Sequence, residues 1–230
     1  LQSAAHNLAR QQHDLRFFEK GRTYGTANGK VFEEERVALL ITGKRWSESW
    51  RSADRKTELA DVKEEIELLI ARMGLGKGTA YAVSEHPLLA SAVEVKHGKK
   101  AIALIGEVAP NVLKTFDVGQ PSWYAEIHDE TLVALLRGSR TTYSEVSKFP
   151  SVRRDLSLLL DRSVAYAQLE QIAYQAERKL LRTVDLFDVY EGDKLPAGKK
   201  SYALSFILQD SEKTLTDEQV DKSTGRIRGA

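Results

Sequence analysis

The chain has 230 residues, of which 42% are hydrophobic and 29% charged, so it can bury a core in one large or two medium domains. Its formal net charge of +1 excludes a broad basic field and confines any nucleic-acid contact to a local patch. It has no cysteine and no apolar run of the roughly 20 residues that span a membrane, and a cytoplasmic location fits this. The polar start without an initiator Met indicates a piece of a longer chain.

The first part of the chain is predicted to mix strands with helices. Strands are expected at residues 15–24, 37–42, 80–84, 91–96, 100–108 and 123–127. Helices are expected at residues 2–10, 58–73, 110–116 and 131–136. Trp46 and Trp50 lie in a polar segment, where we expect them to pack as partly buried side chains rather than to form a ligand cage.

Residues 137–147 are polar and aperiodic, which predicts a domain boundary. We expect a first domain at 1–138, a linker at 139–147 and a second domain at 148–230. The second domain reads as a strand at 155–160, a helix at 166–179, a hairpin at 184–209 and a helix that starts at a capping box on Thr216. This order is ferredoxin-like without its last strand. After Lys222 the apolar pattern fails, so the last helix and strand are expected to be truncated or irregular.

The hairpin carries an unusual second strand. Its large apolar residues point one way and its small residues point the other, the two sets being Tyr202, Leu204, Phe206 and Leu208 against Ser201, Ala203 and Ser205. In the first strand, Phe187 and Val189 suit the core face, which places Asp188 and Tyr190 on the flat face. A ring on a flat sheet can stack on a nucleobase, and a carboxylate can accept from a base edge. The alternative is a hairpin whose outer face is merely small.

Alternation in the strand at 155–160 places Ser157 outside as well. If that strand neighbours the strand of Tyr190, the two side chains can bracket one planar ring. Paired basic residues occur near the strand ends, where they would hold phosphates at the rim. The candidates are Arg154, Lys199 and Lys200.

Chemistry of other kinds is not indicated. Gly74–Thr79 resembles a phosphate loop but follows a helix, and the five histidines lack metal-ligand spacing. No nucleophile is paired with a base. We therefore expect no catalytic and no metal-binding residues in this chain.

Four segments of the second half resemble one family in order and spacing. They are FPSVRRDLS (149–157), LFDVYEG (186–192), LPAGKKS (195–201) and KTLTDE (213–218). The family is the C-terminal anticodon-binding domain of the beta subunit of bacterial phenylalanyl-tRNA synthetase. LRFFEKGR (15–22) and GEVAP (106–110) resemble the part of that subunit that precedes it. The resemblance implies an α+β fold, with an antiparallel class II synthetase-like sheet followed by a ferredoxin-like βαββα(β) domain.

The resemblance also implies a function. The full enzyme is an (αβ)2 tetramer that joins phenylalanine to its tRNA with ATP and Mg²⁺, and catalysis lies on the alpha subunit. This chain would be a non-catalytic part that holds no cofactor, binds the anticodon of tRNA-Phe, supports assembly with the alpha subunit, and contacts neither DNA nor membrane. In the family a tyrosine and a small residue sandwich the first anticodon base beside an acidic residue, which implies these roles for Tyr190, Ser157 and Asp188. The alternative is a ferredoxin-like regulatory module that binds a small ligand or a partner protein.

Overall fold

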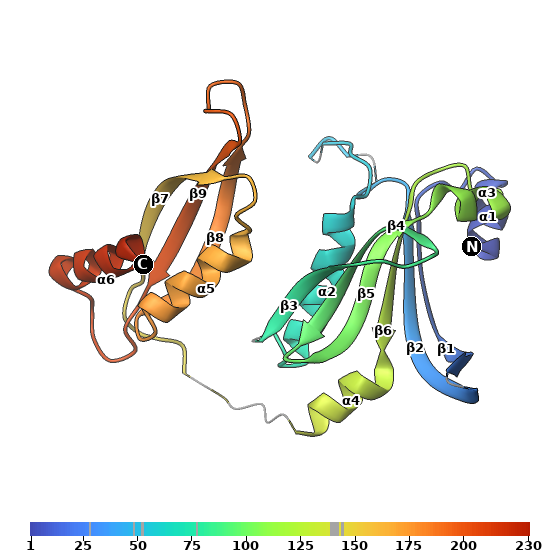
Figure 1. Cartoon of the computed structure of the whole chain (residues 1–230), viewed down its shortest axis with the longest axis horizontal. Coiled ribbons are helices and arrows are strands. Elements are labelled where there is room, and N and C mark those ends of the chain that lie inside the picture. Colours follow the sequence, from blue (N-terminus) through green and yellow to red (C-terminus); the bar gives the residue numbers. More distant parts are fainter. Residues whose placement is uncertain (28, 48, 52, 77, 139–142, 144) are drawn as a thin grey trace. The chain divides into compact units, whose positions relative to one another are not determined.

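The computed structural model of the chain describes every residue except 28, 48, 52, 77, 139–142 and 144. It forms two compact units, Leu1–Thr142 and Tyr143–Ala230 (Figure 1). Each unit buries its own hydrophobic core. Much of the predicted linker at 139–147 lies outside the described residues. No helix among those that are described is both long and apolar enough to cross a membrane.

Unit 1 is built on one antiparallel sheet. Its elements are, in chain order, α1 (Gln2–Leu8), β1 (Leu15–Ala27), β2 (Lys30–Thr42), α2 (Leu59–Arg72), β3 (Thr79–Ser84), β4 (Leu89–His97), β5 (Lys100–Val108), α3 (Pro110–Thr115), β6 (Ser122–His128) and α4 (Asp129–Arg137). The strands pair in the order β1-β2-β6-β5-β4-β3. The predicted α+β class with an antiparallel sheet is confirmed.

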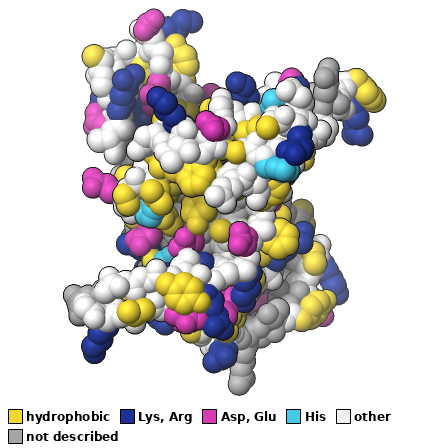
Figure 2. All heavy atoms as spheres, turned by 90° about the vertical axis from the view of Figure 1, so that its right-hand side faces the viewer, with side chains coloured by type: hydrophobic (Ala, Val, Ile, Leu, Met, Phe, Trp, Pro, Cys, Tyr) yellow, Lys and Arg dark blue, Asp and Glu magenta, His cyan; other side chains and the backbone are white. Residues whose placement is uncertain are grey.

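Helix α2 covers one face of this sheet because its apolar stripe of Val62, Ile66 and Ile70 meets the side chains that the strands turn toward it. On the other face, α1 and α3 cover one end, where Ala4 and Leu113 form a smaller core. Figure 2 views the molecule from the side of β1 and α1, and it shows hydrophobic side chains gathered near the middle with acidic side chains beside them.

An ion network around the buried Asp61 fixes the segment between β2 and α2. Asp61 on α2 is 2% exposed and accepts from Arg55 Nη1 and Nη2 at 2.8 and 2.6 Å. The Nε of buried Arg45 lies 3.1 Å from the same carboxylate. The loop between these arginines leaves Trp46 exposed and Trp50 95% exposed, so the expectation that they pack as partly buried side chains was wrong.

Unit 2 has the ferredoxin-like order predicted from the sequence. Its elements are β7 (Val152–Asp161), α5 (Tyr166–Ala176), β8 (Leu181–Tyr190), β9 (Lys199–Leu208) and α6 (Asp217–Gly229). The strands pair antiparallel in the order β7-β9-β8. The core lies on the face that Leu204, Phe206 and Leu208 share with residues of α5 and α6, as the alternation in β9 predicted.

The prediction of a truncated or irregular last helix was wrong, because α6 continues to Gly229. Its start is as predicted: Thr216 caps the helix and accepts from the Gln219 N–H at 3.4 Å. Val220, Ser223 and Ile227 form the buried stripe, and the small Ser223 lets the helix approach closely.

Candidate nucleic-acid interface

The sheet of unit 2 has one face packed against α5 and α6 and one outer face, where small and polar side chains lie beside the exposed Leu159 and Phe187. Ser201 and Ala203 of β9 form the middle of this outer face, and both are half-buried. Ser157 on β7 and Asp188 on β8 are exposed on either side. Among the described residues of this unit, the outer face therefore carries no covering helix.

The order of strands corrects one expectation. The strands of Ser157 and Tyr190 are not neighbours, because β9 lies between them. The register gives two rows across the outer face: Ser157, Ala203 and Asp188, then Leu159, Ser201 and Tyr190. Two strand spacings, about 10 Å, separate the outer strands. A planar ring bracketed by Ser157 and Tyr190 would thus lie over β9, whose small side chains leave room for it.

The two rows are also linked directly. Ser157 Oγ lies 3.5 Å from Ser201 Oγ, which is the side chain paired across the ladder with Tyr190. Through this contact, the hydroxyl of Ser157 reaches the row of side chains that contains Tyr190. The described part of the chain offers Asp188 no hydrogen bond or ion pair, so its carboxylate can accept from a ligand.

A β-bulge sets the direction of the side chains on β8. The register shifts between Leu186 and Asp188, which makes Phe187 an extra residue. Leu186 therefore packs on the core while Asp188 and Tyr190 still face outward. Phe187 is 52% exposed and its ring lies 5.1 Å from the Arg153 guanidinium, so the prediction that it faces the core was wrong. The change in apolar spacing, from two residues to three between Val184, Leu186 and Val189, was the signal for this bulge.

Tyr190 is 40% exposed and its ring lies against the backbone of Gly192. A Cβ built on Gly192 would be 2.3 Å from Tyr190 Oη. The absence of a side chain at residue 192 is thus what permits this position of the ring.

We expect Gly192→Ala to displace the Tyr190 ring and to weaken any ligand that stacks on it, with less than about 1 kcal/mol change in the free energy of unfolding because the ring is half-exposed. Urea titration and ligand titration of the same protein test this. Gly225→Ala is the control, because a Cβ there has nothing within 4 Å. Unchanged ligand binding by Gly192→Ala would contradict the role assigned to the ring position.

The charged candidates divide between the two faces. Lys199 lies on the outer face, where its Nζ is 2.8 Å from Asp161 Oδ1. Lys200 is 5% exposed on the core side and donates from Nζ to Tyr202 Oη at 2.7 Å, so its predicted place at the outer rim was wrong. Lys200 is in phase with Tyr202 and Leu204, and that phase was already visible in the sequence.

Arg154 is likewise misplaced by the prediction. It pairs with the buried Phe206, and cross-strand partners share a face, so it lies on the core side. Arg153 takes the outer position instead. Hydrogen bonding to Asp155 raises the pKa of Arg153, which keeps it cationic. The predicted strand began at residue 155, but β7 begins at Val152. The alternation of side chains between the two faces therefore includes Arg153 and Arg154, which the prediction missed.

The described residues contain no group of three or more His, Asp and Glu side chains that could hold a metal ion. The side chains in this part of the chain thus do not fit a magnesium site. The outer face offers a stacking ring, an acceptor carboxylate, a hydroxyl and cations. These groups suit recognition of a nucleobase and its phosphate.

Each of the two units matches the model of a known protein family. Residues 147–230 match the model of the ferredoxin-fold anticodon binding domain, and residues 1–128 match the model of the phenylalanyl tRNA synthetase beta chain CLM domain. The two matches define an aminoacyl-tRNA synthetase protein. The chain belongs to the phenylalanyl-tRNA synthetase beta chain family.

The chain is 40% identical to the phenylalanine–tRNA ligase beta subunit of Bacteroides fragilis and 34% identical to that of Neisseria meningitidis. These alignments cover 99% and 97% of this chain but only 29% and 28% of the relatives. The chain thus spans under a third of their length. A pyrrolysyl-tRNA synthetase structure from Desulfitobacterium hafniense matches with a TM-score of 0.44 and 15% identity over 58% of this chain and 46% of that one.

Proposed function

We propose that the outer face of the β7-β9-β8 sheet binds the anticodon of tRNA-Phe. One base would lie over Ser201 and Ala203, with the Tyr190 ring on one side and the Ser157 hydroxymethyl group on the other. The observation that carries this proposal is the open sheet face with a half-exposed tyrosine above small residues. Stacking of a base on an aromatic side chain contributes about 1–3 kcal/mol.

The surrounding groups have separate roles in this proposal. Asp188 accepts a hydrogen bond from the edge of the base, and Lys199 contacts a phosphate, as the sequence predicted. Arg153, rather than Arg154, supplies a second cation, because only Arg153 lies on the outer face. Lys200 takes no part, since it is buried on the other side.

Membership of the family supports a proposal for the whole chain. Residues 1–138 form a non-catalytic synthetase-like domain, 139–147 a linker and 148–230 the anticodon-binding domain. The chain acts within a phenylalanine–tRNA ligase in the cytoplasm, where the alpha subunit is its partner and carries out the ATP- and Mg²⁺-dependent reaction. The contribution of this chain is recognition of tRNA and support of assembly.

Lys199 and Lys200 give a matched pair of variants. We expect Lys199→Met to reduce the salt dependence of stem-loop binding by about one unit in the slope of log K against log salt, because one phosphate contact is lost. Lys200→Met removes the same charge but should leave the slope unchanged, since its charge is buried on the core side of the sheet, where it makes no phosphate contact. Equal changes in both variants would contradict the assignment of faces.

The experiment that tests the proposed function is a titration of the chain with a fluorescently labelled anticodon stem-loop of tRNA-Phe and with the same stem bearing a scrambled loop. We expect saturable, salt-sensitive binding that prefers the native loop. Equal affinity for both loops would leave only a non-specific electrostatic contact and would overturn the proposal. No binding to either loop would favour a regulatory or protein-interaction module instead.

A further inference from the structure

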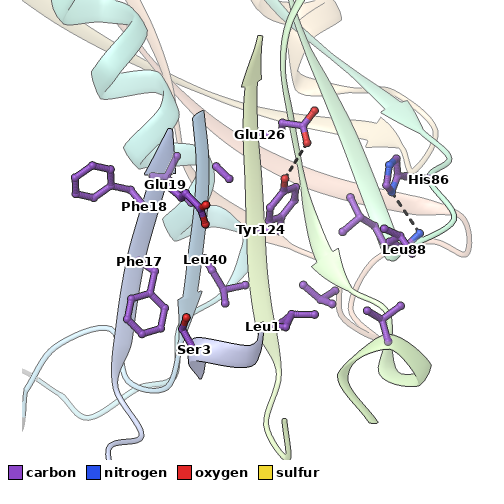
Figure 3. A pocket seen from close by; sticks show the side chains of 15 residues that line it. Leu1, Ser3, Phe17, Phe18, Glu19, Leu40, His86, Leu88, Tyr124 and Glu126 are labelled. Atoms are coloured by element: carbon purple, nitrogen blue, oxygen red, sulfur yellow. Dashed lines mark hydrogen bonds between the residues drawn. The ribbon is translucent and has the colours of Figure 1, made fainter. Parts of the chain in front are cut away.

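Unit 1 contains a cavity that the proposed anticodon function does not use. It has a volume of about 700 Å³ and opens on the sheet face opposite α2 (Figure 3). Strands β1, β2 and β6 form its floor, and the segment before β4 and the start of the chain form its walls. Small organic molecules bind in cavities of about 300–1,000 Å³. The size of this cavity therefore permits a ligand of that kind.

The register places two rows of side chains on the floor. In one row Glu19, Ala38 and Glu126 follow each other across β1, β2 and β6. Two carboxylates thus flank a methyl group, about two strand spacings or 10 Å apart. The small Ala38 leaves space between them, and a compact positive group placed there would meet a carboxylate on each side.

The second row adjoins the first and is apolar in its middle. It consists of Phe17, Leu40 and Tyr124, so a ligand body over Leu40 would lie between two aromatic rings. The opposite wall adds further apolar side chains, including Leu88 and Val112. Figure 3 shows Leu88 facing the strands across the cavity. The cavity is therefore acidic at one end and apolar over most of its surface.

Of the two carboxylates, Glu126 pairs with an arginine, whereas Glu19 pairs with none that the structure describes. Glu126 accepts from Arg36 Nε at 3.0 Å and from Tyr124 Oη at 2.8 Å. Glu19 has no cationic partner within the described residues. Burial, and then the hydrogen bond to Glu126, raises the pKa of Tyr124, so its hydroxyl stays a neutral donor whose lone pairs can accept from a cation. The end of the cavity at Ala38 thus carries an uncompensated negative charge.

We propose that this cavity binds a small primary amine with an aromatic or branched alkyl body. The ammonium group lies over Ala38 between Glu19 and Glu126, and the body lies over Leu40 between Phe17 and Tyr124. A phosphate or carboxylate ligand is disfavoured by the same two glutamates. A free amino acid is disfavoured for the same reason, whereas an amine without a carboxylate is accepted.

Calorimetric titration of the whole chain with 2-phenylethylamine tests the proposal, with 2-phenylethanol and phenylalanine as matched probes. The alcohol lacks the charge, and the amino acid adds a carboxylate. We expect a dissociation constant for the amine of about 1 mM, as suits a ligand of this size, and weaker binding of both other probes. Equal binding of the alcohol, or no heat with the amine at concentrations tenfold above that value, would overturn the proposal.

Variants locate the site. Glu19→Gln should weaken amine binding about tenfold, because a charge-assisted hydrogen bond is lost. Glu33→Gln is the control: it removes the same charge on the same hairpin, where Glu33 pairs with Arg22 outside the cavity. Ala38→Leu should abolish binding by filling the space between the carboxylates. Amine binding that persists unchanged in Glu19→Gln, or that falls equally in Glu33→Gln, would show that the ammonium does not lie at this site.

Discussion

Replacement of Asp61 by asparagine is expected to lower the free energy of unfolding of unit 1 by about 3 kcal/mol. The carboxylate is buried and receives Arg55 and Arg45, so removal of its charge leaves two guanidinium groups without their shared partner. Breaking a buried ion pair from one side costs about 3–5 kcal/mol. The lower limit applies because Arg45 keeps Glu64 and Glu65 at 2.9 and 3.0 Å.

This unfolding can be followed in the whole chain. The three tryptophans all lie in unit 1, so urea titration monitored by tryptophan fluorescence reports that unit alone. Asp54→Asn is the matched control, because Asp54 pairs with Lys44 at the surface and such pairs contribute at most about 1 kcal/mol. Similar losses in both variants would contradict the importance of the buried network.

The same carboxylate gives a pH dependence. Hydrogen bonds from Arg55, and then from the Glu58 backbone N–H, hold the pKa of Asp61 below its ordinary value despite its burial. A carboxyl with a lowered pKa stabilises the fold above the pKa of the unfolded chain, near 3.9, and that contribution is lost as the pH falls through the folded value. The stability difference between the native chain and Asp61→Asn should thus be constant from pH 7 to 5 and shrink below about pH 4. A difference that grew on acidification would contradict this sign.

Tyr190→Ala is expected to weaken recognition of tRNA-Phe by about 1–3 kcal/mol, or roughly 5- to 150-fold. The substitution removes the ring on which we propose that the base stacks, while leaving the floor of Ser201 and Ala203 in place. In a complete ligase assembled with the variant, kcat/KM for the tRNA should fall by that factor. Activation of phenylalanine should be unchanged, since that step does not involve the anticodon.

Two further variants separate stacking from other effects. Tyr190→Phe keeps the ring and should retain most of the affinity. Tyr143→Ala removes an equally large exposed ring from a position outside the sheet and should have no effect. Aminoacylation that is indifferent to Tyr190→Ala would refute a stacking role, whatever the fold of unit 2.

Most of what the sequence predicted about the interface came from the strict alternation of large and small side chains along β9. Tyr202 and Leu204 on β9 are large and apolar while Ser201 and Ala203 are small, so both the core face and the floor could be read without coordinates. The prediction failed at Phe187, where a bulge interrupts the alternation, and at Arg154, where β7 begins earlier than predicted. The bulge at Phe187 adds one residue and inverts the phase of β8, because side chains on a strand alternate with period two.

Other features depend on contacts between segments far apart in the sequence. The buried stripe of Val220, Ser223 and Ile227 on α6 contains a serine, a polar residue that an apolar pattern does not predict. Its hydroxyl accepts from Arg226 Nη2 at 3.1 Å, and Arg226 also pairs with Glu177, which lies 49 positions away in the sequence. The cavity floor brings Glu19 and Glu126 into one row through the register of three strands. No local pattern in the sequence predicts the order and register of strands across a sheet, so the row of Glu19 and Glu126 could not be predicted.

The most direct test of the account places 2-aminopurine at the first anticodon position of the stem-loop and measures its fluorescence during titration with the chain. If that base lies between Tyr190 and Ser157, its fluorescence should be quenched on binding to the native chain and to Tyr190→Phe, and much less on binding to Tyr190→Ala at saturation. Equal quenching with Tyr190→Ala, or no change with the native chain although the stem-loop is bound, would contradict the central claim.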